Sequence, residues 1–368
     1  MVQEMLYTKR INALRNKMAK QGLDAVWVVE PANRRYLSGF KAIDPQLTES
    51  AGSLLITQDE AILITDSRYG AEAKAEAPDF EVKVVKGEAA QVLGSCILET
   101  GAKRIGFEED YVTYQLYKEL VEKLDHGSKL FPIKGLIKDM RQIKDPYEIE
   151  ALKASAEMIS SIMGEIIGWL TPGLTEREVA WQIHTLAYRG GAEDLAFPPI
   201  VASGPNAALP HAIAGDKKIS TDEPIVLDMG VKLNGYCSDI TRTVFLSEPS
   251  AEFKKIYSVV REAQKEAFEV MRAGLMSDEV DGVARDVIKK RGYGEYFGHA
   301  LGHGVGLATH EAPRIGPLKP VRLEAGMIVT VEPGIYLPGK GGVRLEEMVL
   351  IQETGVELLT KDPNFYEF

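Results

Sequence analysis

The stretch PIVLDMGVKLNGYCSDITRTVFL, residues 224–246, places one aspartate in each of two apolar runs that flank an Asn-Gly pair. Asn-Gly between apolar runs is the strongest short-range signal for a β-hairpin, because a type I′ turn needs positive φ at both central residues. We therefore expect two antiparallel strands joined at Asn234 and Gly235. A carboxylate inside an apolar strand needs an explanation, and here there are two, Asp228 and Asp239.

The register of this hairpin brings the two carboxylates together. With the turn at the Asn-Gly pair, Leu233 pairs with Tyr236, and Asp228 then pairs with Thr241. Asp239 lies two residues from Thr241, so it shares a face with Asp228 and lies diagonal to it. Diagonal positions are roughly 7–8 Å apart at the backbone, so both side chains reach a common point. Two carboxylates there would repel each other unless a cation or a proton lay between them.

A second acidic hairpin follows near the end of the chain. The run MIVTVEPGIY carries Glu332, and the run GGVRLEEMVLI carries Glu346 and Glu347. Because neighbours in a strand face opposite ways, only one of the two adjacent glutamates can point inward. Arg344 shares a face with Glu346.

Between the hairpins, residues 297–316 contain three of the six histidines, namely His299, His303 and His310. Carboxylates with an imidazole suit a hard to borderline cation such as Mn²⁺, Co²⁺ or Zn²⁺. Four carboxylates carry more negative charge than one divalent ion neutralises, which favours two ions that share a bridging water and lower its pKa. Each residue alone has an ordinary structural explanation, as a strand-edge aspartate or a packed histidine, so the combination carries the hypothesis.

The chain divides into an α/β region and a second region with different patterning. Residues 1–130 alternate strand-like segments (DAVWVV, GSLLIT, AILIT, RIGFE) with helix-like ones (RYGAEAKAEA, TYQLYKELVEKL), which predicts an α/β domain. Residues 131–144 are irregular and basic, as in a linker. The second region is predicted at residues 145–368, where DPYE opens a helix with Asp145 as N-cap and Glu148 closing a capping box.

The second region repeats itself weakly. Each half has a long helix, a glycine turn, a second helix and then an apolar hairpin with acidic residues, which indicates a duplication. The residues that match at one constant offset are Gly173 with Gly274, Glu178 with Glu279, and Gly191 with Gly292.

Composition excludes some classes of function. Lys and Arg number 43 against 54 Asp and Glu, for a net charge of −11, and the chain has no basic tract, which disfavours nucleic-acid binding. No apolar run approaches the ~20 residues that span a bilayer, and no signal-peptide segment is recognised, so we expect a cytoplasmic protein without membrane partners. The two cysteines, Cys96 and Cys237, are expected to be reduced thiols.

With these motifs in view, the chain resembles the pita-bread metallopeptidases of the Xaa-Pro group, which include prolidase and aminopeptidase P. The resemblance rests on LDMGVKLNGYCSDITRT, HGVGLATHE, VEPGIY and VRLEE, and in the N-terminal half on NRRYLSGF and TDSRY. It implies an N-terminal α/β domain and a pita-bread catalytic domain with duplicated halves. It also implies an exopeptidase that hydrolyses Xaa-Pro bonds with a hydroxide activated by two divalent ions, with Mn²⁺ favoured over Co²⁺ and Zn²⁺.

The resemblance also implies roles for individual residues. The metal ligands would be Asp228, Asp239, His303, Glu332 and Glu346, with Asp239 and Glu346 shared by both ions. Glu332 would also carry a proton from the water to the leaving nitrogen. The other catalytic residues implied are His211, in SGPNAALPHAIAG, and His310. Further side chains would bind substrate or brace the site, and these are His299, Tyr336 and Arg344.

Prolidase and aminopeptidase P differ in the substrate group that follows proline. A dipeptidase needs a cation to bind the carboxylate that ends its substrate. The candidates are Arg314, Arg322 and Arg344, and also Arg34 or Arg35 from a partner subunit. We prefer a dipeptidase slightly over an aminopeptidase that acts on longer peptides. A non-catalytic pita-bread binding module is a remoter alternative, disfavoured by the complete ligand set, and a di-metal hydrolase without proline preference stays open. The family pattern implies a homodimer.

Overall fold

The computed structural model describes residues 2–44, 46, 49–125 and 127–368. The chain folds as two compact units, residues 1–141 and residues 142–368. Residues 131–144, the stretch predicted to be a linker, include the end of strand β6 (Lys129–Ile133) and the helix α6 (Lys138–Gln142).

The first unit is an α/β domain built on a six-stranded sheet with the order β4-β3-β2-β1-β5-β6. Strands β1, β5 and β6 run parallel, as do β3 and β4, whereas β2 is antiparallel to both of its neighbours. The remaining strands are β1 (Ala25–Val28), β2 (Gly52–Thr57), β3 (Ala61–Thr65), β4 (Glu81–Val84) and β5 (Arg104–Glu108). The helices are α1 (Val2–Gln21), α2 (Pro31–Ser38), α3 (Gly70–Glu76), α4 (Ala89–Thr100) and α5 (Tyr114–Lys123).

The four strands predicted in this unit are confirmed as β1, β2, β3 and β5. Their side chains fill the core together with those of α4 and α5, and Trp27, Leu55 and Ile105 are buried there. Strand β4 was not predicted, because its sequence EVKV has no buried residue and so lacks the apolar signal of a core strand.

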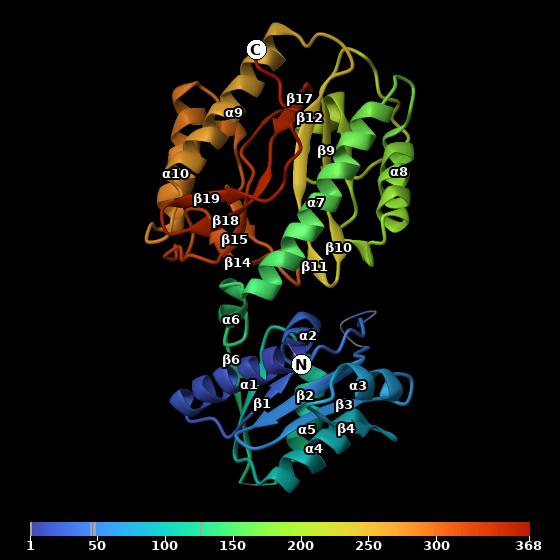
Figure 1. Cartoon of the computed structure of the whole chain (residues 1–368), viewed down its shortest axis with the longest axis vertical. Helices are drawn as coiled ribbons and strands as arrows, with labels where there is room; N and C mark the ends of the chain where they lie inside the picture. Colours follow the sequence, from blue (N-terminus) through green and yellow to red (C-terminus); the bar gives the residue numbers. More distant parts are fainter. Residues whose placement is uncertain (1, 45, 47–48, 126) are drawn as a thin grey trace. The chain divides into compact units, whose positions relative to one another are not determined.

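The second unit consists of two helix pairs and several small sheets (Figure 1). The helices are α7 (Pro146–Trp169), α8 (Glu176–Arg189), α9 (Ala251–Val270) and α10 (Ser277–Lys290), with 3₁₀ turns η1 (Gly204–Ala208) and η2 (Gly294–Tyr296). The sheets have the orders β11-β10-β7, β12-β9-β8, β14-β13-β15-β18-β19 and β16-β17. The first-half strands are β7 (Asp194–Leu195), β8 (Ile200–Ser203), β9 (Ile225–Met229), β10 (Val231–Leu233), β11 (Tyr236–Cys237) and β12 (Ile240–Val244). The second-half strands are β13 (Gly302–Gly304), β14 (Glu311–Ile315), β15 (Ile328–Val331), β16 (Gly334–Leu337), β17 (Gly341–Arg344), β18 (Glu347–Gln352) and β19 (Gly355–Leu358).

The two halves of this unit repeat one arrangement, as the sequence predicts. Each helix pair packs on strands of its own half, so α7 and α8 share one hydrophobic core and α9 and α10 share another. Gly173 and Gly274 both have φ of 92°. Their N–H groups donate to Ile219 O at 2.9 Å and to Leu323 O at 2.8 Å. The same backbone geometry therefore occurs at equivalent points of both halves.

The start of α7 is confirmed at the predicted residue. Asp145 accepts a hydrogen bond from Glu148 N at 3.0 Å, and Asp145 N donates to the Glu148 carboxylate at 3.1 Å. This reciprocal pair satisfies two N–H groups that a helix end leaves without a partner. The helix is thereby fixed at the beginning of the second unit.

The repeated glycine turn gives a stability prediction. Ala in place of Gly274 should destabilise the protein by about 1–2 kcal/mol, because an L residue at positive φ brings its Cβ too close to the carbonyl oxygen. Ala in place of Gly164, inside α7, should stabilise it by about 0.5–1 kcal/mol. Apart from the local backbone, a Cβ at either position meets no atom within 4 Å, so the pair isolates the backbone effect. Urea denaturation of both variants measures it, and equal changes would contradict the strain argument.

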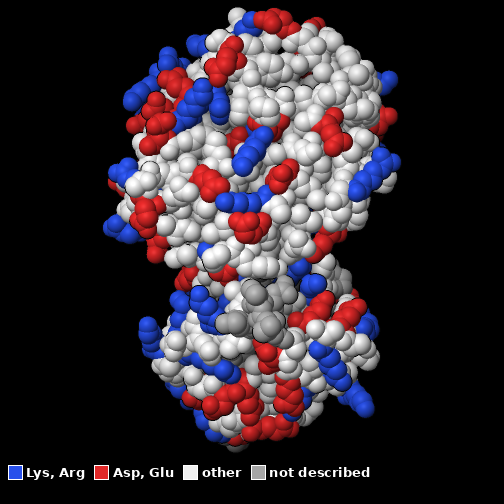
Figure 2. Space-filling model, viewed as in Figure 1, with Lys and Arg blue, Asp and Glu red and all other residues white. Residues whose placement is uncertain are grey.

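Charges of both signs mix on the face of the molecule that Figure 2 shows, where acidic and basic side chains are interspersed. Among the described residues, no helix is long and apolar enough to cross a membrane.

Candidate active site

The first acidic hairpin has the predicted register. Leu233 pairs with Tyr236, and Asp228 of β9 pairs with Thr241 of β12. Asn234 and Gly235 have φ of 52° and 86°, as a type I′ turn requires. The carboxylates of Asp228 and of Asp239, the residue just before β12, are both buried.

The second hairpin joins the first through its main chain. Val331 of β15 pairs with Glu347 of β18, so Glu332 and Glu346 occupy neighbouring positions just beyond this pair. Glu346 N donates to Thr241 O at 3.0 Å, which ties the second half of the unit to strand β12 of the first. Glu346 also accepts from Thr241 Oγ1 at 2.6 Å. The two acidic hairpins are therefore in direct contact.

Strand β13 brings an imidazole to the same place. His303 Nε2 lies 3.7 Å from Asp239 Oδ2 and 3.5 Å from Glu332 Oε1. Its Nδ1 lies 3.0 Å from Gly304 O, and donation to this carbonyl leaves Nε2 with a lone pair toward the carboxylates. Potential ligand atoms of Asp239, His303 and Glu346 all lie within 4.8 Å of one another.

These groups line one cavity of about 600 Å³. Every catalytic, bracing and metal-ligating residue that the sequence predicts lines it, and so does Arg314, one of the arginine candidates. They are His211, Asp228, Asp239, His299, His303, His310, Arg314, Glu332, Tyr336, Arg344 and Glu346. Sequence reasoning missed an apolar part of the wall that includes Phe197, Pro198, Ile200 and Ile213.

The carboxylates of the cavity are crowded in a way that favours a bound cation. Burial, followed by the charges of Glu346, Asp228 and Glu332, raises the pKa of Asp239. Burial and neighbouring carboxylates also raise the pKa of Glu346, and burial is the main cause that raises the pKa of Glu332 to about 8. Without a cation, the folded protein therefore disfavours several ionised carboxylates in this cluster.

Two further observations fit divalent metal ions. Asp228 Oδ1 is buried and forms no hydrogen bond with the described residues, so it can act as a ligand. Burial, and then the charge of His310, lowers the pKa of His303 to about 4, which keeps the imidazole neutral as metal binding requires. Oxygen donors with one neutral imidazole match the preferences of borderline divalent ions.

A chain of polar contacts braces one side of the cavity. Arg344 Nη2 donates to Asp228 Oδ2 at 2.5 Å, and Arg344 Nη1 donates to Tyr336 Oη at 2.9 Å. Tyr336 Oη lies 2.9 Å from His299 Nε2. Burial alone would lower the pKa of Arg344, but Tyr336, Asp228 and Glu332 raise it, so the guanidinium stays charged. Arg344 is therefore engaged with Asp228 and not available to a substrate carboxylate.

The other arginine candidates differ in their surroundings. Arg34 is fully buried and pairs with Asp44 at 2.9 Å, and Arg35 lies beside it in α2. Arg322 donates to Gly274 O and is not among the cavity residues. Arg314 lines the cavity, and its guanidinium forms no hydrogen bond or ion pair with the described part of the chain.

Two buried polar residues behind the site were also missed. Arg242, in β12, donates to Glu346 O at 2.8 Å. Gln264, in α9, donates to Val331 O at 3.2 Å and to Leu345 O at 3.1 Å, the residues just before Glu332 and Glu346. No local signal in the sequence marks either residue, because Arg242 lies between two threonines and Gln264 is followed by the exposed Lys265.

A two-half fold whose carboxylates and imidazole converge in one cavity has the ligand groups of a metal-dependent enzyme. Residues 150–353 match the model of metallopeptidase family M24, and residues 10–143 match the creatinase/prolidase N-terminal domain. This chain therefore belongs to metallopeptidase family M24, which implies that divalent metal ions serve its catalysis.

The similarity to known proteins covers almost the whole chain. An Xaa-Pro dipeptidase of Pyrococcus furiosus is 38% identical over 353 residues, which are 96% of this chain and 98% of that protein. The structure of an Xaa-Pro dipeptidase from Bacillus anthracis has a TM-score of 0.92 and 38% identity, covering 97% and 98% of the two chains. The structure of an X-Pro aminopeptidase from Thermotoga maritima has a TM-score of 0.85 and 40% identity, covering 93% and 96%.

Proposed function

We propose that this protein is a metal-dependent Xaa-Pro dipeptidase. The observation that carries the proposal is the pairing, in one cavity, of a carboxylate cluster suited to metal ions with Arg314, a cation that has no partner among the described residues. A dipeptide Xaa-Pro ends in a carboxylate immediately after proline, and a guanidinium binds such a group through charge-assisted hydrogen bonds. The names of the dipeptidases similar to this chain support the same substrate class.

Two divalent ions would be held by the residues of the carboxylate cluster. Asp228 would serve one ion, His303 and Glu332 the other, and Asp239 and Glu346 both. We propose Mn²⁺, with Co²⁺ or Zn²⁺ as alternatives, since the oxygen-rich donor set with one imidazole suits all three. When bound, such ions lower the pKa of a water and polarise the carbonyl that is to be hydrolysed.

The protein groups around the cluster would move the protons and hold the substrate. Glu332 would take a proton from the attacking water and give it to the proline nitrogen. Burial, and then the charge of His211, lowers the pKa of His310. The neutral His310 would donate an N–H to the carbonyl oxygen as negative charge develops there. His211 would contact the substrate from the exposed loop on which it lies.

The preference for proline would follow from the shape of the bond and the cavity wall. An Xaa-Pro bond lacks an N–H, so an enzyme that binds this proton cannot recognise it. The apolar side chains of Phe197, Ile200 and Ile213 offer contact to a pyrrolidine ring. His299 and Tyr336 would brace Arg344 and so keep it fixed beside Asp228.

An Xaa-Pro aminopeptidase acting on longer peptides is the second candidate. It is favoured by the likeness to the Thermotoga maritima X-Pro aminopeptidase at 40% identity. A non-catalytic binding module is a weaker candidate, because such a module has no need of a full set of ligand side chains.

We also propose a cytoplasmic homodimer. The two buried free thiols, Cys96 and Cys237, are consistent with a reducing compartment, and light scattering in solution tests the dimer.

A substrate panel tests the proposal. Full-length protein loaded with Mn²⁺ is incubated with Ala-Pro, Ala-Pro-Ala and Ala-Ala, with and without a chelator. We expect Ala-Pro to be cleaved much faster than the other two, and cleavage to stop with the chelator. Preference for the tripeptide would favour the aminopeptidase, and equal cleavage of Ala-Ala would contradict the proline preference.

A further inference from the structure

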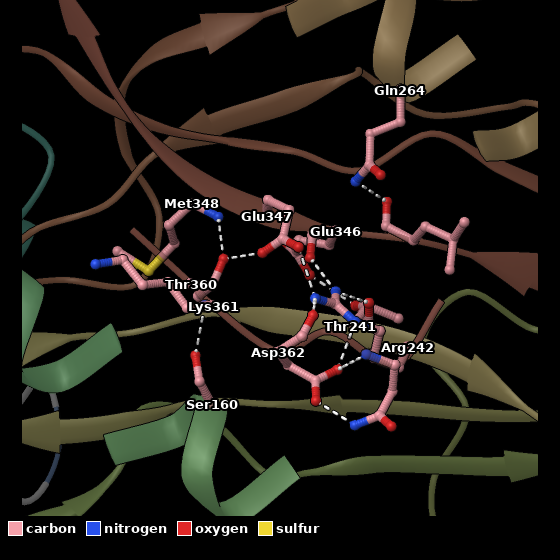
Figure 3. A network of polar contacts seen from close by, with 12 residues as sticks. Ser160, Thr241, Arg242, Gln264, Glu346, Glu347, Met348, Thr360, Lys361 and Asp362 are labelled. Atoms are coloured by element: carbon pink, nitrogen blue, oxygen red, sulfur yellow. Dashed lines mark hydrogen bonds and ion pairs between the residues drawn. The ribbon is translucent and has the colours of Figure 1, made fainter. Parts of the chain in front are cut away.

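Behind the carboxylate cluster lies a fully buried guanidinium, that of Arg242 (Figure 3). An arginine has five N–H donors, and this one has five acceptors. Nε donates to Asp362 Oδ2 at 2.8 Å and Nη1 to Thr241 O at 3.0 Å and Glu346 O at 2.8 Å. Nη2 donates to Glu347 Oε1 at 2.6 Å and Asp362 O at 2.8 Å. The side chain is thus fixed in one position.

This guanidinium holds the main chain of a candidate metal ligand. Glu346 is bound at three points: its C=O accepts from Arg242, its N–H donates to Thr241 O, and its carboxylate accepts from Thr241 Oγ1. The adjacent Glu347 turns the other way and pairs with Arg242. The two neighbouring glutamates therefore have different partners, one in the cavity and one behind it.

The charge of Arg242 is balanced by Glu347 and by the C-terminal segment, residues 359–368, which has no helix or strand. Asp362 is buried, and its carboxylate binds Arg242 at 2.8 Å. The segment is anchored to both halves of the unit. Lys361 N donates to Ser160 Oγ of α7 at 3.0 Å, and Thr360 Oγ1 accepts from Met348 N at 3.1 Å. The ring of Phe365 lies 4.2 Å from the guanidinium.

We propose that Arg242 and Asp362 are positioning residues for Glu346, so that the C-terminal segment helps to set the geometry of the metal site without touching metal or substrate. This inference rests on the proposed metal-dependent function. Groups behind a metal site orient the ligands and tune their basicity, and their loss costs about 10- to 100-fold in metal affinity or activity. Loss of Asp362 would leave Arg242 with an unused Nε donor and free the backbone of Glu346 to shift.

The test compares Asp362→Ala with Asp362→Asn in the full-length protein. Mn²⁺ is titrated calorimetrically into chelator-treated protein, and melting temperature, kcat and KM are measured alongside. We expect D362A to bind Mn²⁺ about 10- to 100-fold more weakly and to lose kcat more than KM. D362N keeps an oxygen acceptor for Arg242 Nε, so it should restore most of the affinity.

A matched control separates positioning from stability. In the first unit, Asp44 pairs with the fully buried Arg34 at 2.9 Å. Asp44→Ala should lower the melting temperature without changing the Mn²⁺ affinity. If D362A behaves in the same way, losing stability alone, the inference is wrong.

Should D362A fail to fold, Arg242→Lys keeps the charge but has only three donors, and we expect the same weakening of Mn²⁺ binding. Wild-type affinity in folded R242K would then overturn the inference while the proposed function stands. Wild-type protein that binds no Mn²⁺, Co²⁺ or Zn²⁺ would overturn the proposed function and this inference with it.

Discussion

Replacing Asp239 with asparagine is expected to abolish peptide hydrolysis. Asp239 is one of the two groups that we assign to both ions, and one of its oxygens lies within 4.8 Å of potential ligand atoms of His303 and Glu346. Metal ions contribute several kcal/mol of transition-state stabilisation. Since each 1.36 kcal/mol corresponds to a factor of ten, the expected loss in kcat/KM is about 10³-fold or more. Steady-state kinetics with Ala-Pro at saturating Mn²⁺ measures it.

The same substitution should have opposite effects on stability with and without metal. Burial raises the pKa of Asp239, so its ionised form destabilises the folded protein at neutral pH, where the unfolded chain ionises freely. Asparagine removes this charge, and D239N should therefore melt higher than wild type in chelator. With Mn²⁺ the wild type should melt higher than D239N. The metal ion stabilises only the folded state, and D239N binds it more weakly.

Asp286→Asn is a suitable control, because Asp286 is exposed on α10. It should change neither activity nor the order of melting temperatures. For a unit of this size, about 1 kcal/mol corresponds to roughly 2–4 °C, which thermal denaturation resolves. If D239N keeps wild-type activity, or if its melting temperature is lower than that of wild type in chelator, the assignment of Asp239 is wrong.

Replacing Arg314 with glutamine is expected to separate dipeptides from longer substrates. Hydrogen bonds to charged groups contribute about 1.5–3 kcal/mol, so KM for Ala-Pro should rise about 10- to 100-fold. Ala-Pro-amide lacks the terminal carboxylate, so R314Q should hydrolyse it as wild type does. Initial rates over a range of both substrates give the two KM values.

Arg322→Gln provides the matched control. Arg322 is also exposed and lies eight residues further along the chain, but it does not line the cavity. R322Q should therefore leave both KM values unchanged. Equal rises in KM for Ala-Pro and its amide in R314Q would mean that Arg314 acts on something other than the carboxylate, which would remove the main support for a dipeptidase.

Local signals made much of the fold and site predictable. The Asn-Gly turn sets the pairing of Asp228 with Thr241 by counting alone, because a two-residue loop leaves one register. The capping box at Asp145 fixes the start of α7 because its partners lie within one turn. The adjacent glutamates could be assigned to opposite faces because strand side chains alternate.

What the sequence did not reveal depends on contacts between distant residues. Arg242 and Asp362 are 120 positions apart, and no local pattern connects them. The arginine candidates could not be separated either, since only the folded chain pairs Arg344 with Asp228 and leaves Arg314 in the cavity. The apolar wall at Phe197 and Ile200 was missed for the same reason, because these residues meet Ile213 and the distant carboxylates only in the folded chain.

The repeated architecture of the second unit has a consequence for how the enzyme loses its structure. Asp228 and Asp239 come from one half, whereas His303, Glu332 and Glu346 come from the other. Ions bound between the two halves would act as cross-links between two separate hydrophobic cores. The loaded enzyme should therefore unfold in a single cooperative step, and depletion of metal should let one half open before the other.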